Sequence, residues 1–179
     1  MTDNMSVDLS YRNEDDKCYG ATGMAVAIVV FDGEDKLSAL DLDASADEMV
    51  EFVNDFYFSG NPGLSAKAAW NHILKNFNLE IALTIGNVMC RHMVLDHVAV
   101  APEIKKLLGE CISEEGKRWC ALEDDELKRL FEKNYTYLFR VFNHRGVQEV
   151  VHDFAGALKR RRRMSRLDIM EQLRALSMF

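Results

Sequence analysis

A long apolar stripe predicts that the central element of this chain is a helix over residues 64–98. Its large apolar residues recur at steps of three and four, the spacing of one helical face: Trp70, Leu74, Phe77, Ile81, Ile85, Val88 and Leu95. Between residues 81 and 90 the apolar positions occupy nearly the whole circumference, so other segments have to cover this helix on every side. We therefore expect Ile81, Ile85 and Val88 to be buried.

The pattern before residue 45 is that of strands. Residues 24–31 are an uninterrupted apolar run rich in β-branched residues, and residues 36–42 alternate between apolar and polar positions. Together they predict an antiparallel hairpin over 24–42. Residues 5–11 also alternate, so the segment 1–20 is predicted to be either partly disordered or an edge strand of the same sheet.

From residue 45 onward the sequence predicts helices. Ser45 and Glu48 have the spacing of a capping box ahead of apolar residues 49–56, and Ser165 and Asp168 repeat that spacing near the C-terminus. We predict an α+β, predominantly α-helical fold in which residues 21–179 form one globular domain. In it, a small N-terminal sheet over 24–43 packs with a five- or six-helix bundle over 45–177, gathered around the long central helix.

Basic residues gather in one short run. Residues 1–60 hold 14 acids and 3 bases, whereas residues 61–179 hold 15 acids and 19 bases. The run, with one arginine just beyond it, comprises Lys159, Arg160, Arg161, Arg162, Arg163 and Arg166. Such a run can neutralise the phosphates of a polyanion. It can equally be a solvated junction between helices or an intramolecular partner of the acidic N-terminal third. The absence of interleaved aromatic residues and the net charge of −7 argue against a dedicated nucleic-acid-binding protein.

Two short patterns offer weak metal-ligand candidates. Glu149 and His152 form a Glu-x-x-His sequence, but a ferritin-like di-iron site needs two such motifs and the chain has one. His92 and Asp96 lie one turn apart on the long helix and share a face, which also suits a histidine bonded to a neighbouring carboxylate. The chain has no P-loop, no dinucleotide-binding glycine motif and no nucleophile elbow, so we predict no cofactor.

The function predicted from these patterns is that of a non-catalytic, self-associating interaction domain. A strand over 24–31 that is apolar on both faces needs a second neighbour, from residues 5–11 or from another subunit, which predicts a homodimer through the N-terminal sheet. The four cysteines lack metal-site or secreted-scaffold spacing, and no apolar run is long enough to span a bilayer, so we expect a cytoplasmic protein with no membrane partner. A nucleic-acid-associated protein and a metal-binding bundle or enzyme using His and Glu remain as alternatives.

Overall fold

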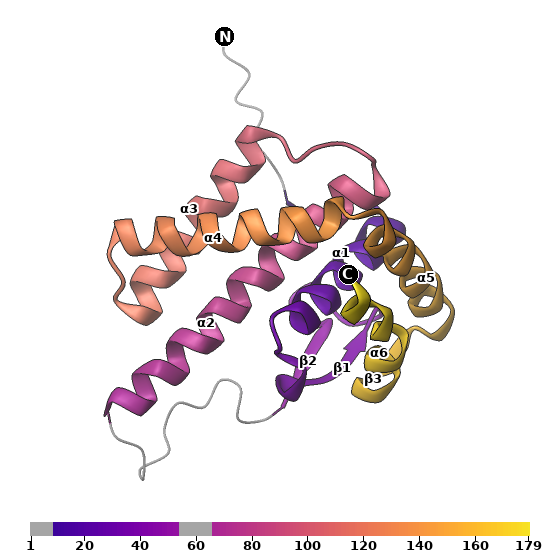
Figure 1. Cartoon of the computed structure of the whole chain (residues 1–179), viewed down its shortest axis with the longest axis horizontal. Coiled ribbons are helices and arrows are strands. Elements are labelled where there is room, and N and C mark those ends of the chain that lie inside the picture. The colour runs from indigo at the N-terminus through magenta and orange to yellow at the C-terminus, as the bar shows by residue number, and fades with distance from the viewer. Residues whose placement is uncertain (1–8, 54–65) are drawn as a thin grey trace.

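The computed structural model describes residues 9–53 and 66–179. In these residues the fold is α+β and predominantly α-helical, as predicted, with six α-helices and a three-stranded antiparallel sheet (Figure 1). Helix α2 (Ala66–Met89) runs through the molecule, and a π-helical turn (Cys90–Leu95) continues it. The predicted long helix is therefore confirmed from Ala66 to Met89, while residues 64 and 65 lie outside the described part of the chain. Its predicted end is wrong, because the π-helical turn ends at Leu95 and residues 96–98 are not helical.

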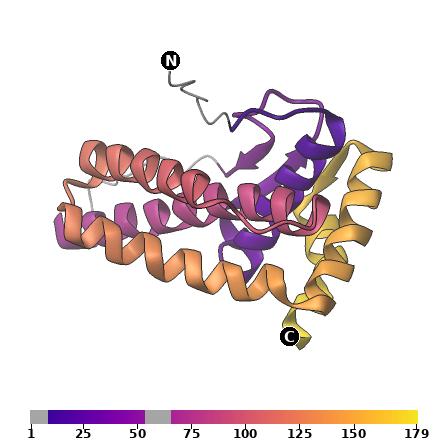
Figure 2. The ribbon, with the colours of Figure 1, turned by 90° about the horizontal axis from the view of Figure 1, so that it is seen from above.

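Helix α2 is the centre of the core. Ile81, Ile85 and Val88 are 1%, 0% and 3% exposed, which confirms that they are buried. Helix α2 packs against α1 (Glu14–Val30), α3 (Pro102–Cys120) and α4 (Asp124–Asn143). Figure 2 shows α2, α3 and α4 lying side by side as an elongated layer, with α1, α5 (Arg145–Arg161) and the sheet at one end.

The predicted hairpin over 24–42 is wrong in its first strand, because residues 24–30 belong to helix α1. Asn13 caps this helix, its side-chain oxygen accepting a hydrogen bond from the Asp16 amide at 2.9 Å, and three acids occupy the first turn. A helix covered on every side and a buried strand both present an unbroken apolar run, so periodicity does not separate them. Val26, Ala27 and Ile28 are each 0% exposed.

The N-terminal segment also differs from the prediction. Residues 14–20, placed by the sequence outside the globular domain, form the first turns of α1. Residues 9–11 form no strand, and residues 5–8 of the predicted edge strand lie outside the described residues. The acids Glu14, Asp15 and Asp16 are thus part of the folded body.

Two glycines set the distance between α1 and α2. A Cβ atom on Gly23 would lie 2.1 Å from the carbonyl oxygen of Gly86, and one on Gly86 would lie 2.7 Å from the carbonyl oxygen of Gly23. Both separations are shorter than any real contact of a Cβ atom. The close crossing of these helices therefore requires glycine at both positions.

Strand β1 (Leu37–Asp41), the second strand of the predicted hairpin, is the middle strand of the sheet. It pairs antiparallel with β2 (Val50–Phe52) on one side and with β3 (Arg163–Ser165) on the other. The helix predicted after Ser45 is wrong over 50–52, which form β2, and its residues 54–56 lie outside the described part. Residues 46–48 form a turn, so the first predicted capping box begins no helix. The alternation of Val50, Glu51 and Phe52 was the better signal.

The C-terminal helices agree with their sequence patterns. At the start of α6 (Arg166–Gln172), the Asp168 amide donates to the Ser165 hydroxyl at 3.3 Å and the Asp168 carboxylate accepts from the Ser165 amide at 3.0 Å. This confirms the second predicted capping box. A short 3₁₀ turn (Arg174–Met178) ends the chain. Among the described helices, none combines the length and the apolar character that a membrane span requires.

Candidate functional site

Most of the basic run faces acids of the N-terminal third. Lys159 pairs with Asp15, and Arg162 pairs with Glu14 and Asp43. Arg163 pairs with Glu51 at 2.6 Å. These three basic residues therefore pair with acids of the same chain, as one of the alternatives left open by the sequence requires.

The remaining members of the run differ in their pairing. Arg161 forms an ion pair with Asp168 of α6 at 3.0 Å. Arg160 and Arg166 form no ion pair with any residue in the described ranges. Polyanion binding by the run stays a prediction, with these two arginines as its unpaired charges.

The four metal-ligand candidates lie in separate contacts. The Nδ1 atom of His152 is hydrogen-bonded to the Tyr19 hydroxyl at 2.7 Å. Glu149 pairs with Arg145 at 3.4 Å, and Asp96 pairs with Arg12 at 2.9 Å. Across residues 9–53 and 66–179, no three His, Cys, Asp or Glu side chains gather so as to hold a metal ion.

His92 sits in the π-helical turn and is partly buried. Burial and the neighbouring charge of Arg91 lower the pKa of His92 below its usual value. The neutral imidazole is therefore favoured at neutral pH.

A buried ion pair joins α1 to the π-helical turn. Arg91 donates two hydrogen bonds to the Asp16 carboxylate, at 2.9 and 2.7 Å, and two more to the carbonyl oxygens of Leu9 and Ser10. Asp16 is 0% exposed. Burial alone would raise the pKa of Asp16, but hydrogen bonds from Arg91 and Arg12 outweigh it and hold this pKa below its usual value. Each charge in this group has a partner inside the chain.

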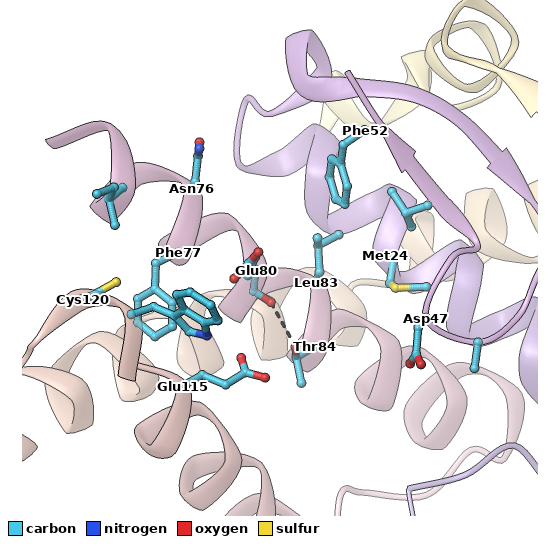
Figure 3. Close-up of a pocket in the computed structure, with 14 residues that line it drawn as sticks. Met24, Asp47, Phe52, Asn76, Phe77, Glu80, Leu83, Thr84, Glu115 and Cys120 are labelled. Atoms are coloured by element: carbon cyan, nitrogen blue, oxygen red, sulfur yellow. Dashed lines mark hydrogen bonds between the residues drawn. The ribbon is translucent and has the colours of Figure 1, made fainter. Parts of the chain in front are cut away.

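A cleft of about 800 Å³ lies between α2, α3 and β2 (Figure 3); we call it the α2–α3 cleft. Phe77, Glu80 and Leu83 line it from α2, while Glu115 and Trp119 line it from α3. Phe52 of β2 faces them across the opening, and Met24 and Asp47 lie toward the far end (Figure 3). The cleft is thus built from segments distant in the sequence.

The apolar part of the cleft contains an exposed aromatic ring. Phe77 and Leu83 are buried, at 3% and 7% exposed, and form part of the floor. Trp119 is 66% exposed, although tryptophan is highly buried on average. A large indole left open to solvent beside a cavity is typical of a binding surface.

The polar part of the cleft carries negative charge that the described residues leave unpaired. Three acids (Asp47, Glu80 and Glu115) line it, and no described lysine or arginine does. Burial and the charge on Glu115 raise the pKa of Glu80 to about 7. The Thr84 hydroxyl donates to the backbone carbonyl oxygen of Glu80 at 3.0 Å and not to its carboxylate.

Sequence reasoning did not find this cleft. The sequence patterns assign no role to Glu80, Glu115 or Trp119. One signal was present, because Glu80 is the carboxylate nearest to the fully apolar stretch that begins at Ile81. A charged residue at the edge of a buried helix requires a polar surrounding or a partner.

The fold and the cleft together define an α+β, mainly helical protein with a partly apolar, acidic cleft. Comparisons with protein-family models, with curated proteins and with solved structures find no match to this chain. The functional argument therefore depends on the site itself.

Proposed function

We propose that this protein is a non-catalytic interaction domain that binds a partner in the α2–α3 cleft. The observation that carries the proposal is the exposed ring of Trp119 beside a cleft of about 800 Å³. A volume of this size is within the range of known binding sites, about 300–1,000 Å³. Exposed aromatic residues at such sites are common energetic anchors of binding.

The polar groups of the cleft suit recognition better than reaction. Cys120 is 1% exposed, and burial together with the charge of Glu80 raises the pKa of its thiol, which favours the unreactive protonated form. The Thr84 hydroxyl donates to a backbone carbonyl rather than to a base. A nucleophile activated by a neighbouring base would need the opposite arrangement.

The proposal does not retain the homodimer through the N-terminal sheet. That expectation depended on a strand over 24–31 with two apolar faces, but residues 24–30 belong to α1, in which residues 25–28 are buried within the chain. Strand β1 has both of its neighbours, β2 and β3, within the same chain. We propose instead that the cleft binds a molecule other than a second copy of this chain. All four cysteines are free thiols, which favours the cytoplasm as the compartment in which the protein binds its partner.

Affinity capture with matched variants tests the proposal. Wild type, Trp119→Ala and the control Leu167→Ala would each be immobilised and exposed to lysate of the source cells. Leu167 is 76% exposed on α6, so its change removes exposed apolar surface outside the cleft. We expect wild type and Leu167→Ala to retain the same proteins, and Trp119→Ala to lose at least one of them. Equal retention by all three, or no retention above bare resin, would contradict the proposal.

A further inference from the structure

We propose that the segment bound in the α2–α3 cleft belongs to a protein partner and carries a lysine or arginine beside a large apolar side chain. This inference rests on the proposed function, because it names the chemistry of the partner at that same site. It follows from the charge, the aromatic surface and the length of the cleft.

The charge of the cleft calls for a cation from outside. Glu80 from α2 and Glu115 from α3 reach into the same space (Figure 3), and the charge on Glu115 acts on Glu80. Asp47 adds a third carboxylate, and none of the described lysines or arginines forms an ion pair with any of the three. A bound ammonium or guanidinium group would offset this repulsion.

The titration of Glu80 links the bound cation to pH. With a pKa of about 7, Glu80 is only partly charged at neutral pH, and a neighbouring cation favours its charged form. The titratable groups that interact with it are Glu115 and Cys120 on α3, and Asp47 before β2 lines the cleft toward its other end. All of these are acidic, so binding of a cation should release a proton and strengthen as the pH rises through 7.

The aromatic wall suits the body of a basic side chain. The Arg118 guanidinium lies over the Trp119 ring, 5.2 Å from its centroid, and the indole is still 66% exposed, so a further side chain can pack against it. Phe77 and Leu83 supply the apolar floor. A lysine or arginine packs its aliphatic stem on such a surface while its charged end reaches a carboxylate.

The length of the cleft favours a chain segment over a small amine. Its lining extends along α2 from Ile73 to Thr84. Eleven helical residue steps span about 16 Å. That length matches about five residues of an extended chain. A single basic side chain fills the end near Glu80 and Glu115, which leaves the end near Phe52 and Met24 for the neighbouring apolar residue.

Selection from a random peptide library tests the inference on the full-length protein. Short peptides would be selected on wild type, and their binding measured with Trp119→Ala, with the double variant Glu80→Gln/Glu115→Gln, and with the control Glu171→Gln. Glu171 is an exposed acid on α6, so the control removes a negative charge away from the cleft. Thermal unfolding of each variant would verify that it is folded.

We expect the selected peptides to carry lysine or arginine next to an aromatic or aliphatic residue. Their binding should weaken about tenfold or more in the double variant and stay unchanged in Glu171→Gln. Binding to wild type should also be tighter at about pH 8 than at about pH 6, on either side of the Glu80 pKa.

Two results separate failure of the inference from failure of the proposed function. Peptides that need Trp119 but lack basic residues, or that ignore the double variant, would overturn the inference and leave the cleft as a binding site. Peptides indifferent to Trp119→Ala, or no selected peptide at all, would overturn both. Hexylammonium ion that binds the cleft as tightly as the peptides would overturn the assignment to a protein segment.

Discussion

Two groups of acids in this molecule have opposite surroundings. At the junction of α1, α5 and the sheet, Glu14, Asp15 and Asp43 each face a base of the run 159–163. In the α2–α3 cleft, Glu80 and Glu115 face each other without such a base. The pKa changes have opposite directions, since that of Asp43 is lowered by Arg162 and that of Glu80 is raised.

The difference separates stabilising charges from charges available to a partner. Acids paired within the chain add modestly to stability and have little left to offer a ligand. Acids that repel each other in a partly buried cleft reduce stability, which is a property expected of binding sites. The most conspicuous charge feature of the sequence, the arginine run, thus belongs mostly to the first group.

The largest effect is expected where the paired charges are buried. Replacing Arg91 with Ala leaves the Asp16 carboxylate buried with fewer partners, which should lower the free energy of unfolding by about 3–5 kcal/mol. The loss would be measured as the shift of the denaturant midpoint, with the dependence of the free energy of unfolding on denaturant concentration unchanged. A loss below about 1 kcal/mol would mean that the pair contributes little to the fold.

The same pair predicts how stability depends on pH. The pKa of Asp16 is lowered in the folded protein, so its stabilising contribution is complete above the ordinary pKa of 3.8. It should be lost as the pH falls below that value toward the folded pKa. Arg91→Ala should show a weaker loss over the same acidic range.

A smaller effect is expected at the exposed junction. Changing Lys159, Arg162 and Arg163 together to Gln removes the pairs with the acidic N-terminal third, and should lower the denaturant midpoint slightly at low salt and less at high salt. The matched control is Arg160→Gln, because Arg160 belongs to the same run and has no ion pair among the described residues. Equal effects of the two changes would contradict the pairing. Salt-sensitive retention of wild type on DNA or RNA, lost in the triple variant, would favour the polyanion alternative.

Glu80→Gln should change stability in the opposite direction. Because the pKa of Glu80 is raised from 4.5 to about 7, the folded protein holds more protons than the unfolded chain between these values, and stability falls as the pH rises through them. The variant should therefore be more stable than wild type at about pH 8, by about 1 kcal/mol, because the carboxylate is partly exposed and screened. At about pH 4 the two proteins should be equal. Glu171→Gln should show no such pH-dependent difference in stability from wild type.

The smallest change in stability is expected for Trp119→Ala. The ring is 66% exposed, so its removal should alter the free energy of unfolding by less than about 0.5–1 kcal/mol. Phe77→Ala, in the buried floor of the same cleft, should cost about 3–5 kcal/mol. A Trp119 variant as unstable as the Phe77 variant would make the indole a structural residue.

Much of the fold could be predicted because several elements carry their own local signals. The apolar stripe of α2 and the capping box at Ser165 each specify a helix without reference to distant residues. The failure over 24–31 has a physical cause, since burial on all sides removes the periodicity that separates a helix from a strand. Asn13 followed by three acids was the local signal of a helix start.

The cleft could not be predicted because no local pattern encodes it. Trp119 and Glu80 are far apart in the sequence, and nothing in either neighbourhood gives their exposure. The pairing of the run could be anticipated only as one alternative, because the charge totals of the two parts of the chain do not say which base meets which acid. Tertiary packing decides both.

A single measurement tests the contrast between the two groups of acids most directly: an NMR titration of the side-chain carboxyl carbons of Asp16, Asp43 and Glu80 in the folded protein. The account predicts that Asp16 and Asp43 titrate below their ordinary values while Glu80 titrates near pH 7. A Glu80 carboxyl that titrates at its ordinary value of 4.5 would contradict it, because Glu80 would then be neither desolvated in the cleft nor repelled by Glu115.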